Sequence, residues 1–227
     1  MKIIENIKGF QELSLMEWTK VVASIIFLGG CNFRCFYCHN HTVAFEPSTV
    51  PSLSFDEILN YFDKKRGWID GVVISGGEPT IYREELPDFM RIFKQRGLKV
   101  KLFTNGYNVE VIERLIRENL IDAISMDIKH CPERYEEIIR VSPPQLKERI
   151  HSAVSLIKRA PIEKEFRLTL IKGFHSLEDI SKIKNLVMPV SLIIQNVFSE
   201  LIREEEKGFV IPFSEEEFLD IKRQCEV

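Results

Sequence analysis

Three cysteines lie close together near the start of the chain, and their thiols are the groups best suited to chemistry in this sequence. Cys31, Cys35 and Cys38 have the spacing C-x3-C-x2-C. Thiolates at this spacing suit an iron–sulfur cubane held by three of its irons, whereas protein [4Fe–4S] clusters usually take four cysteine ligands. The next cysteine in the chain is Cys131. A cluster held by three thiolates would keep one iron open for a substrate or a cofactor.

The same cysteines could instead hold a zinc ion or form disulfides. A structural zinc site needs four ligands, and His39 or His41 could supply the fourth. Because His39 directly follows Cys38, adjacent residues would both have to bind the metal, which is geometrically awkward. The five cysteines are few and odd in number, and the N-terminal residues do not form a secretory segment, which argues against a disulfide framework. The iron–sulfur interpretation is therefore favoured.

Composition limits the class of protein. Of the 227 residues, 44% are hydrophobic, which is enough for one full-sized domain with its own core. The net charge is −3, and no run rich in lysine or arginine indicates a nucleic-acid partner. The segment Met1–Phe10 does not resemble a signal peptide, and the longest apolar run, Val21–Leu28, is too short to span a bilayer. We therefore expect a cytoplasmic protein with reduced thiols and no membrane or nucleic-acid partner.

Short runs rich in β-branched residues alternate with amphipathic stretches along the chain. This alternation predicts strands at residues 21–28, 71–75, 99–104, 123–127, 166–171 and 190–197. It predicts helices at residues 54–66, 84–96, 109–119, 145–159, 177–187 and 214–224. Helix start and stop signals agree with these ranges. Ser54 with Glu57 forms a capping box, and Gly97 stands where a helix should end.

A strand that is repeatedly followed by a helix implies a parallel sheet with helical crossovers. A complete (β/α)8 barrel takes about 250 residues and would need two more such units. The sequence therefore predicts an α/β fold, a partial (β/α)6 TIM-like barrel of parallel strands. A doubly wound open sheet is the alternative, because periodicity does not determine whether a sheet closes. No linker rich in glycine or serine is present, so residues 1–227 should form a single domain, with a core at about residues 20–200 and an extension at each end.

The second predicted strand is followed by a turn that could bind a ligand. In parallel α/β proteins the functional side chains gather at the carboxyl ends of the strands, and Gly76, Gly77 and Glu78 stand at such an end. A double glycine lets backbone amides and carbonyls approach a ligand. The carboxylate of Glu78 could bind the positively charged amino group of an amino acid. Many strand–helix turns contain two glycines, so a simple turn is the alternative.

The fourth predicted strand ends in a pair of opposite charges. Asp127 and Lys129 alternate with apolar residues, so both side chains should point to the same face. Lys129 could bind a carboxylate there, or the two residues could form a solvated salt bridge. Weaker candidates lie on the other strands: Asn105 in the turn after the third, Arg167 within the fifth and Gln195 near the end of the sixth.

These motifs resemble those of the radical S-adenosylmethionine (SAM) enzymes. The cysteine spacing, with the aromatic Tyr37 directly before the third cysteine, matches the family signature. The glycine-glycine-glutamate sequence at 76–78 resembles the family's GGE motif. The resemblance implies a partial barrel and a [4Fe–4S] cluster on the three cysteines, whose open iron binds the amino and carboxylate groups of SAM. It also implies that an electron from the cluster splits SAM and releases a 5′-deoxyadenosyl radical.

The resemblance also implies a set of contacts with SAM. Asp127 and Lys129 match a D-x-K motif of glycyl-radical activases, whose lysine contacts SAM. Phe103 stands where some of these activases carry an aspartate of a monovalent-cation site. Beyond the cluster and SAM, no residue is assigned a catalytic role. The candidate SAM contacts are Tyr37, His39, Gly76, Gly77, Glu78, Asn105, Asp127, Lys129, Arg167 and Gln195.

Within this family the chain is most similar to enzymes that activate glycyl-radical proteins. Among these it most resembles the longer form of the anaerobic ribonucleoside-triphosphate reductase activating proteins, through Phe27–Asn40, Ser75–Pro79 and Met126–Lys129. The resemblance implies that the radical takes a hydrogen atom from a backbone glycine of a partner enzyme. A reduced flavodoxin or a ferredoxin-type protein would supply the electron. Cys131 and Cys225 are assigned no role.

Three alternative functions remain open at this point. One is activation of another glycyl-radical enzyme, such as pyruvate formate-lyase. A second is a radical SAM reaction on a small molecule or on RNA, and the lack of a basic patch disfavours RNA. The third is a zinc-binding adaptor without enzymatic activity, which metal analysis would distinguish at once.

Overall fold

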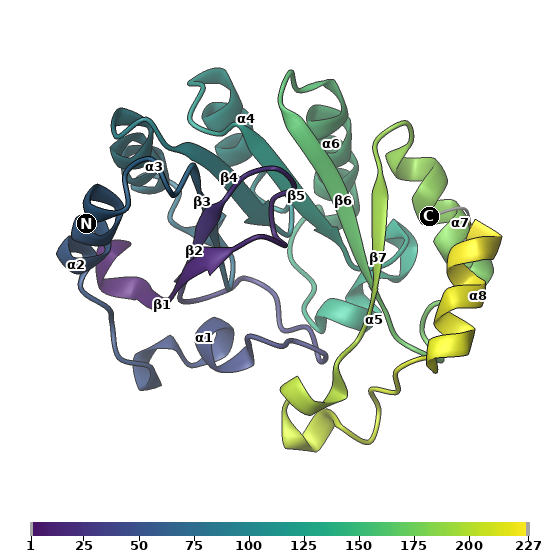
Figure 1. Cartoon of the computed structure of the whole chain (residues 1–227). Helices are drawn as coiled ribbons and strands as arrows, with labels where there is room; N and C mark the ends of the chain where they lie inside the picture. The colour runs from purple at the N-terminus through teal and green to yellow at the C-terminus, as the bar shows by residue number, and fades with distance from the viewer. Residues whose placement is uncertain (1, 226–227) are drawn as a thin grey trace. The chain divides into compact units, whose positions relative to one another are not determined.

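The structure of the chain is a computed structural model that describes residues 2–225. Its strands form one sheet in the order β1-β2-β3-β4-β5-β6-β7 (Figure 1). The strands are β1 (Ile7–Ser14), β2 (Ala23–Leu28), β3 (Gly71–Gly76), β4 (Lys99–Thr104), β5 (Ala123–Ile128), β6 (Glu163–Leu170) and β7 (Leu192–Asn196). The helices are α1 (His41–Phe45), α2 (Phe55–Lys64), α3 (Leu86–Gln95), α4 (Val109–Arg117), α5 (Tyr135–Ile139), α6 (Leu146–Arg159), α7 (Leu177–Val187) and α8 (Glu215–Cys225). No helix among the described residues is long and apolar enough to cross a membrane.

The α/β fold class predicted from the sequence is confirmed, and the sheet is mostly parallel. The pairs β2–β3, β3–β4 and β6–β7 are all parallel. Every predicted strand and every predicted helix is present, with ends that shift by at most a few residues. The predicted bounds of β4 and α7 match the structure at both ends. The alternation of β-branched runs with amphipathic stretches was therefore sufficient to locate these elements.

The sequence does not predict β1, α1 or α5. β1 pairs antiparallel with β2, with Ile7 opposite Leu28 and Ser14 opposite Ala23. Most of its residues are exposed or half-buried, so β1 shows neither clean alternation nor a continuous apolar run. α1 and α5 have five residues each, which is too short to show a helical period.

Contacts divide the chain into two compact units. The first unit holds the residues up to Asn32, residues 42–104 and residues 110–124. The second unit holds residues 33–41, residues 105–109 and the residues from Ser125 onward. The first unit thus contains β1 to β4, and the second contains β6 and β7 with α5 to α8.

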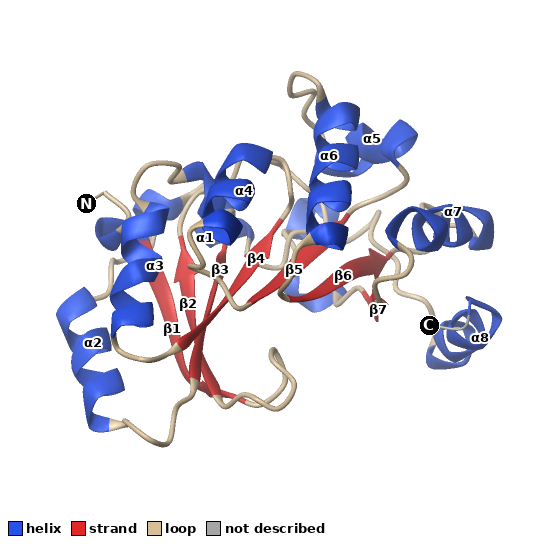
Figure 2. Ribbon diagram, turned by 90° about the horizontal axis from the view of Figure 1, so that it is seen from above, coloured by secondary structure: helices blue, strands red, loops and turns tan. Residues whose placement is uncertain are grey.

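The first unit is built on strands that are buried on both faces. Val72, Val73 and Ile74 of β3 have no exposed surface, as expected for a parallel strand covered on both sides. Helix α2 begins at Ser54, whose hydroxyl accepts a hydrogen bond from the backbone N–H of Glu57. Figure 2 shows α2 and α3 side by side along the strands of this unit. Their packed rings are Phe55, Phe62, Phe89 and Phe93, and each buried phenylalanine contributes roughly 1.5–3 kcal/mol.

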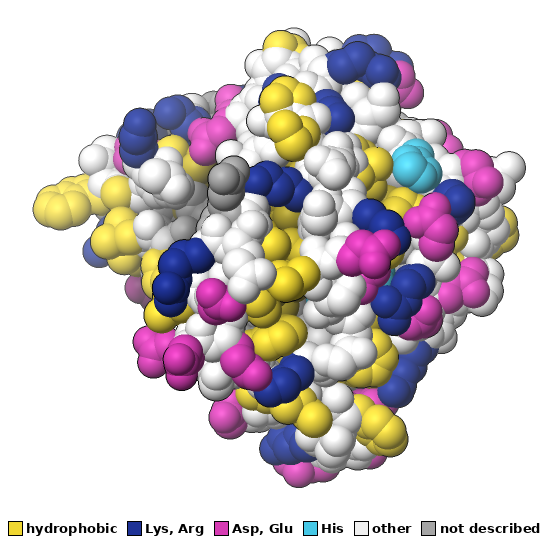
Figure 3. Space-filling view, turned by 90° about the vertical axis from the view of Figure 1, so that its right-hand side faces the viewer, with side chains coloured by type: hydrophobic (Ala, Val, Ile, Leu, Met, Phe, Trp, Pro, Cys, Tyr) yellow, Lys and Arg dark blue, Asp and Glu magenta, His cyan; other side chains and the backbone are white. Residues whose placement is uncertain are grey.

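The second unit packs helices against a parallel pair of strands. Leu168 of β6 lies opposite Ile194 of β7, and the side chain of Leu168 is fully buried. Helix α7 starts with a complete capping box, in which Ser176 and Asp179 each accept a hydrogen bond from the backbone N–H of the other. Figure 3 shows that the face with α7 and α8 mixes hydrophobic side chains with charges of both signs. Helix α7 is therefore fixed at its start by side chains as well as by packing.

Candidate active site

Aromatic side chains fix the cysteine loop of the second unit, which we define as residues 33–41. Phe33 and Phe36 are almost fully buried, although loop residues usually face solvent. The centre of the Phe33 ring lies 5.9 Å from that of Tyr107 and 6.5 Å from that of Tyr135, and both contacts are edge-on. Such contacts stabilise beyond the burial of apolar area. The loop is therefore held from below by apolar packing.

The ring of Phe36 belongs to a second aromatic cluster. It lies 4.8 Å from the ring of Phe174 and 5.8 Å from the ring of Tyr37. The guanidinium group of Arg140 lies 4.9 Å from the centre of the same ring, which is a cation–π contact. Arg140 also forms an ion pair with the buried carboxylate of Glu206. Phe36 thus connects the cysteine loop to segments that are far away in the sequence.

The two cysteines of the loop lie on one tight turn. The backbone N–H of Cys38 donates to the carbonyl of Cys35 at 3.2 Å, and both residues carry thiols. Burial raises the pKa of the Cys35 thiol to about 12, and the nearby cation of Lys129 partly counters this rise. Iron and zinc bind the thiolate, so metal binding must remove this proton. Sulfur ligands on a rigid turn fit an iron–sulfur cluster.

A buried cation lies next to these thiols. The ammonium of Lys129 donates to Oδ2 of Asp127 at 2.9 Å and lies 5.6 Å from the centre of the Tyr37 ring. The Lys129 side chain is 12% exposed and the Asp127 side chain is 48% exposed, so the pair is only partly solvated. Burial lowers the pKa of Lys129, but Asp127 and other neighbours raise it more, so the pKa lies well above its usual value. Lys129 is therefore a permanent positive charge at the end of β5.

Tyr37 places an unsatisfied polar group at the same point. Its hydroxyl oxygen is buried, and within residues 2–225 it has no hydrogen-bond partner. Burial raises the pKa of Tyr37 above its usual value, so the hydroxyl stays protonated. An unpaired buried hydroxyl costs about 1–3 kcal/mol, and a bound polar ligand could offset that cost. The hydroxyl therefore supports a ligand contact at Tyr37.

His39 connects the cysteine loop to the segment after β7. Its Nε2 accepts a hydrogen bond from the backbone N–H of Phe198 at 3.3 Å, and the two rings lie 5.9 Å apart. Burial lowers the pKa of His39 below its usual value, so its ring is neutral at pH 7. His39 can therefore offer a neutral ring face to a ligand, but no charge.

In the first unit, the glycines after β3 pack directly against the end of β2. The backbone N–H of Glu78 donates to the carbonyl of Gly30 at 2.8 Å, and that of Gly77 donates to the carbonyl of Leu28 at 2.8 Å. A Cβ atom on Gly77 would lie 2.0 Å from the carbonyl oxygen of Gly30. Gly76 has φ of +123°, and a Cβ atom there would lie 2.2 Å from the carbonyl oxygen of Leu28. Both positions therefore need glycine for packing, whether or not a ligand binds.

The carboxylate of Glu78 is held by hydroxyl groups. Glu78 is 1% exposed. Its Oε1 accepts hydrogen bonds from the backbone N–H and the hydroxyl of Thr80, at 3.0 and 2.5 Å, and from the hydroxyl of Thr104 at 2.8 Å. Three donors on one oxygen fix the orientation of the carboxylate. Glu78 is thus a buried, oriented carboxyl group close to the end of β2, where Cys31 follows Gly30.

The weaker candidates make local hydrogen bonds. Oδ1 of Asn105 accepts from the backbone N–H of Tyr107 at 3.0 Å, which is an Asx turn. Nε of Arg167 donates to Oε1 of Gln195 at 3.2 Å, between the neighbouring strands β6 and β7. The structure therefore brings Arg167 and Gln195 together and gives Asn105 a role in its own turn.

The predicted site residues thus form separate groups within the two units. In the second unit, Cys35, Tyr37, His39, Asp127 and Lys129 interact electrostatically with one another. In the first unit, Gly76, Gly77 and Glu78 contact the backbone that leads to Cys31. The sequence does not identify the residues that support these groups, which are Phe33, Phe36, Thr80, Thr104, Arg140 and Phe174. Two phenylalanines inside a cysteine-rich loop were the available signal, because apolar loop residues need a pocket.

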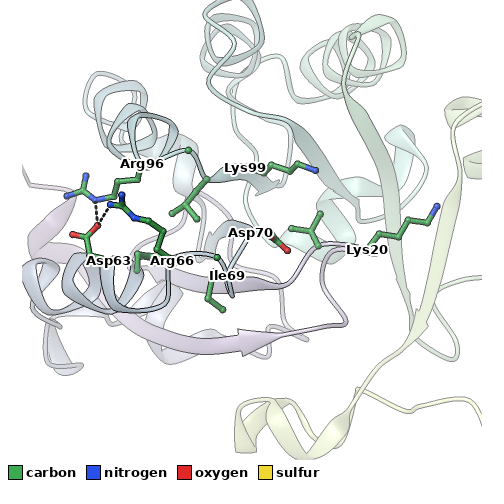
Figure 4. A pocket seen from close by; sticks show the side chains of 12 residues that line it. Lys20, Asp63, Arg66, Ile69, Asp70, Arg96 and Lys99 are labelled. Carbon is green, nitrogen blue, oxygen red and sulfur yellow. Dashed lines mark hydrogen bonds and ion pairs between the residues drawn. The ribbon is translucent and has the colours of Figure 1, made fainter.

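A hollow of about 300 Å³ lies at the opposite ends of the first unit's strands (Figure 4). Asp70, which precedes β3, and Lys99, which begins β4, line it. Inside it Asp63 interacts with Arg66 at 3.3 Å and with Arg96 at 3.8 Å. Chemistry in parallel α/β folds gathers at the carboxyl ends of strands, and these are amino ends. We therefore do not assign the cofactor site to this hollow.

Comparison with known proteins points to one family. The profile of the radical SAM superfamily matches residues 25–187. A Methanocaldococcus jannaschii protein, provisionally named a glycyl-radical enzyme activating enzyme, is 32% identical over 212 residues, which cover 92% of this chain and 87% of that protein. The pyruvate formate-lyase 1-activating enzyme of Escherichia coli strain K12 is 30% identical over 149 residues, which cover 63% of this chain and 59% of that enzyme.

Solved structures show the same fold. The structure of TYW1 with a lysine-pyruvate adduct bound has a TM-score of 0.61 and 18% identity, and covers 90% of this chain and 72% of that chain. A domain of pyruvate-formate lyase-activating enzyme from Bacteroides vulgatus has a TM-score of 0.52 and 18% identity, and covers 68% of this chain and 89% of that chain. At this level of identity the similarity shows the fold alone.

Proposed function

Because the chain belongs to the radical SAM superfamily and to its glycyl-radical enzyme activating enzymes, we propose that it removes a hydrogen atom from a backbone glycine of an anaerobic ribonucleoside-triphosphate reductase. The main structural support for this chemistry is in the second unit. There the buried cation of Lys129 and the unpaired hydroxyl of Tyr37 lie beside the thiols of the cysteine loop. A site with sulfur ligands, a fixed cation and an unsatisfied donor suits a metal cluster with a polar cofactor bound to it.

Radical SAM enzymes use a [4Fe–4S] cluster and SAM, and the residues present fit both. When bound, these groups supply the reductive cleavage and the radical chemistry. Cys31, Cys35 and Cys38 would hold the cluster through their sulfurs. Because the pKa of Cys35 is raised by burial, cluster binding must displace its proton.

Two charges suit the charged ends of the methionine part of SAM. Lys129 stays cationic and can bind the carboxylate. Glu78, oriented by Thr80 and Thr104, can bind the amino group. The two residues lie in different units, and each assignment is supported by the contacts within its own unit.

The other residues of the site bind, orient and exclude water. Removal of a hydrogen atom needs no general acid or base, so none is assigned. Preorganisation of bound groups is the main contribution of a protein to cofactor chemistry. Phe33 and Phe36 supply it here, because their buried rings keep the cysteine loop in one place.

Two glycyl-radical enzymes are candidates for the partner. The motif sequences around Cys31–Asn40 and Met126–Lys129 support the reductase. Pyruvate formate-lyase is the second candidate, because its activating enzymes in Escherichia coli and Clostridium pasteurianum are 30% and 31% identical to this chain over their matched regions. A glycyl-radical protein is the substrate in both cases.

A direct experiment tests the activity and the partner together. Anaerobically prepared protein with a reconstituted cluster is reduced, mixed with SAM and incubated with either candidate partner. We expect SAM cleavage and, with the reductase, the paramagnetic resonance signal of a glycyl radical. A signal with pyruvate formate-lyase alone would replace the first partner by the second. Bound zinc with no iron or sulfide would support the adaptor instead, and the proposal would fail.

The electron donor can be identified in the same assay. We propose a reduced flavodoxin or a ferredoxin-type protein, because a radical SAM cluster must be reduced before it cleaves SAM. Either protein should replace the chemical reductant and support SAM cleavage. If neither does so, the donor assignment is wrong, while the activity itself is unaffected.

A further inference from the structure

Two buried imidazole rings stack on each other beside the end of β5. The rings of His130 and His175 lie 4.8 Å apart with an angle of 20° between their planes. Both residues are buried, and neither is among the predicted site residues. Buried polar rings need hydrogen-bond partners, so the atoms that they contact show what the pair does.

His175 holds the backbone of Lys129. Its Nδ1 accepts a hydrogen bond from the backbone N–H of Ile171 at 3.2 Å. Its Nε2 lies 3.0 Å from the carbonyl oxygen of Lys129. Because Nδ1 accepts, the proton of the neutral ring is on Nε2, which donates to that carbonyl. His175 therefore fixes the main chain at the residue that carries the buried cation.

His130 in turn bonds to the backbone next to His175. Its Nδ1 accepts from the backbone N–H of Cys131 at 2.8 Å and lies 3.0 Å from Sγ of the same residue, whose thiol donates to Asp179. Its Nε2 lies 2.9 Å from the carbonyl oxygen of Phe174. By the same reasoning Nε2 carries the proton and donates. The ring of Phe174 packs against Phe36 of the cysteine loop. A continuous set of contacts thus connects the backbone of Lys129 to the loop that carries Cys35 and Cys38.

A metal ion is the competing explanation for this cluster. One ligand atom each from His130, Cys131 and Asp179 lie within 4.8 Å of one another, and a zinc ion can take these ligand types. However, Nδ1 of His130 already accepts a backbone N–H. Oδ2 of Asp179 accepts from the hydroxyl and N–H of Ser176 and from Arg134, and its Oδ1 accepts from the thiol of Cys131 at 3.4 Å. A metal ion on Nδ1 of His130 would have to displace the backbone bond there and remove the thiol proton of Cys131, so the hydrogen-bonded state is favoured.

The hydrogen bonds require neutral rings. A protonated imidazole has two N–H donors, and its Nδ1 would then face a backbone N–H instead of accepting from it. Burial lowers the pKa of His175 to about 4, although the hydrogen bond to the Lys129 carbonyl opposes this change. Arg134 and Asp179, from the segments packed around the pair, form an ion pair at 3.1 Å. His175 is therefore neutral at pH 7.

We propose that His130 and His175 are positioning residues, a neutral hydrogen-bonded pair that fixes Lys129 relative to the cysteine loop. The proposal rests on the proposed function, because it assumes that Lys129 contacts SAM. Neither ring touches the reacting atoms. Their effect is on the affinity for SAM, exerted through the carbonyl of Lys129 and the ring of Phe174.

Substitution of His175 tests this role. His175→Leu keeps a side chain of similar size but removes both hydrogen bonds. His175→Gln keeps an N–H donor for the carbonyl of Lys129. In cleavage of SAM by chemically reduced protein without a partner, we expect His175→Leu to raise KM for SAM about tenfold and to change kcat by less than about threefold. His175→Gln should restore KM to within about threefold. His151→Leu, at an exposed position of α6, is the matched control and should leave both constants unchanged.

A measurement on the metal-free chain makes the test independent of activity. Nitrogen NMR of selectively labelled histidines at pH 7 should show both rings neutral with the proton on Nε2. A charged ring, a proton on Nδ1 or stoichiometric zinc binding that is lost in Cys131→Ser would overturn the proposal. This measurement and the glutamine variant remain decisive if His175→Leu does not fold. If the unsubstituted protein cleaves SAM and both variants keep its KM, this inference fails alone; if the unsubstituted protein does not cleave SAM, the proposed function fails.

Discussion

The turn after β3 and the cysteine loop are built in different ways. The turn is held by main-chain atoms, because two backbone hydrogen bonds join it to the end of β2. A Cβ atom on Gly77 would lie 2.0 Å from a carbonyl oxygen. The cysteine loop is held by side chains. Phe33 and Phe36 fill pockets made by residues from distant segments, such as Tyr135 and Phe174. The first arrangement tolerates no added atom, whereas the second depends on many contacts of moderate strength.

This difference explains which features are visible in the sequence. A backbone contact that excludes Cβ leaves a glycine at a fixed place, and the glycine is easily seen. A side-chain pocket leaves an ordinary aromatic residue whose partners are far away in the chain.

The cysteine loop should lose its chemistry without losing its fold when one ligand is removed. We expect Cys35→Ala to lose bound iron and at least about a thousandfold of SAM cleavage. The free energy of unfolding should fall by only about 1 kcal/mol, because a buried cysteine packs as a small apolar residue. Iron analysis and circular dichroism measure the two effects. Cys225→Ala, in α8, is the control, and retained iron in Cys35→Ala would contradict the ligand assignment.

The turn should respond to a single methyl group. We expect Gly77→Ala to lower the free energy of unfolding by at least about 3 kcal/mol, because its Cβ atom would meet backbone that cannot move aside. Gly97→Ala is the control, since nothing lies within 4 Å of its Cβ position. Its positive φ of +78° alone should cost about 1 kcal/mol. Urea unfolding measures both, and equal losses would show that the close contact is not what requires glycine at 77.

The second unit should become less stable in acid through His175. The unfolded ring binds a proton below about pH 6.5, whereas the folded ring, with its pKa lowered to about 4, binds it only at lower pH. The unfolded state therefore takes up more protons in this window, and the stability falls as the pH is lowered from 6.5 to 4, by up to about 1.4 kcal/mol per pH unit. Urea unfolding at several pH values should show this slope, and His175→Gln should reduce it. Identical slopes in the two proteins would show that His175 is not buried in its neutral form.

Removal of one donor to Glu78 should have the smallest effect. Thr104→Val keeps the shape of the side chain but removes one of the three hydrogen bonds on the carboxylate oxygen. We expect a loss of about 1 kcal/mol in the free energy of unfolding, together with a rise of a few fold in KM for SAM. Thr49→Val, at an exposed position, is the control. An unchanged KM would show that the orientation of Glu78 does not influence SAM binding.

The sequence predicted the elements that have a clear period and the motifs that have a fixed spacing. Both ends of β4 (Lys99–Thr104) and of α7 (Leu177–Val187) were predicted correctly, because each element combines a periodic pattern with flanking turn signals. Asp127 and Lys129 were expected on one face, and a hydrogen bond joins them. Their position relative to Tyr37 could not be predicted, because it depends on contacts between segments that are distant in the chain. β1 was missed because most of its residues are exposed or half-buried, so its sequence shows no clear alternation.

The contact between Gly30 and Gly77 also has a consequence for how the first unit can be modified. Backbone hydrogen bonds from Gly77 to Leu28 and from Glu78 to Gly30 join the two ends of the intervening chain segment. The geometry of this junction therefore does not depend on the length of that segment. Lengthening a flexible loop carries only a small entropic penalty. The turn at Gly67 and Trp68 has open space around Gly67 and an exposed indole. It is therefore a suitable insertion point for a reporter domain or an affinity tag.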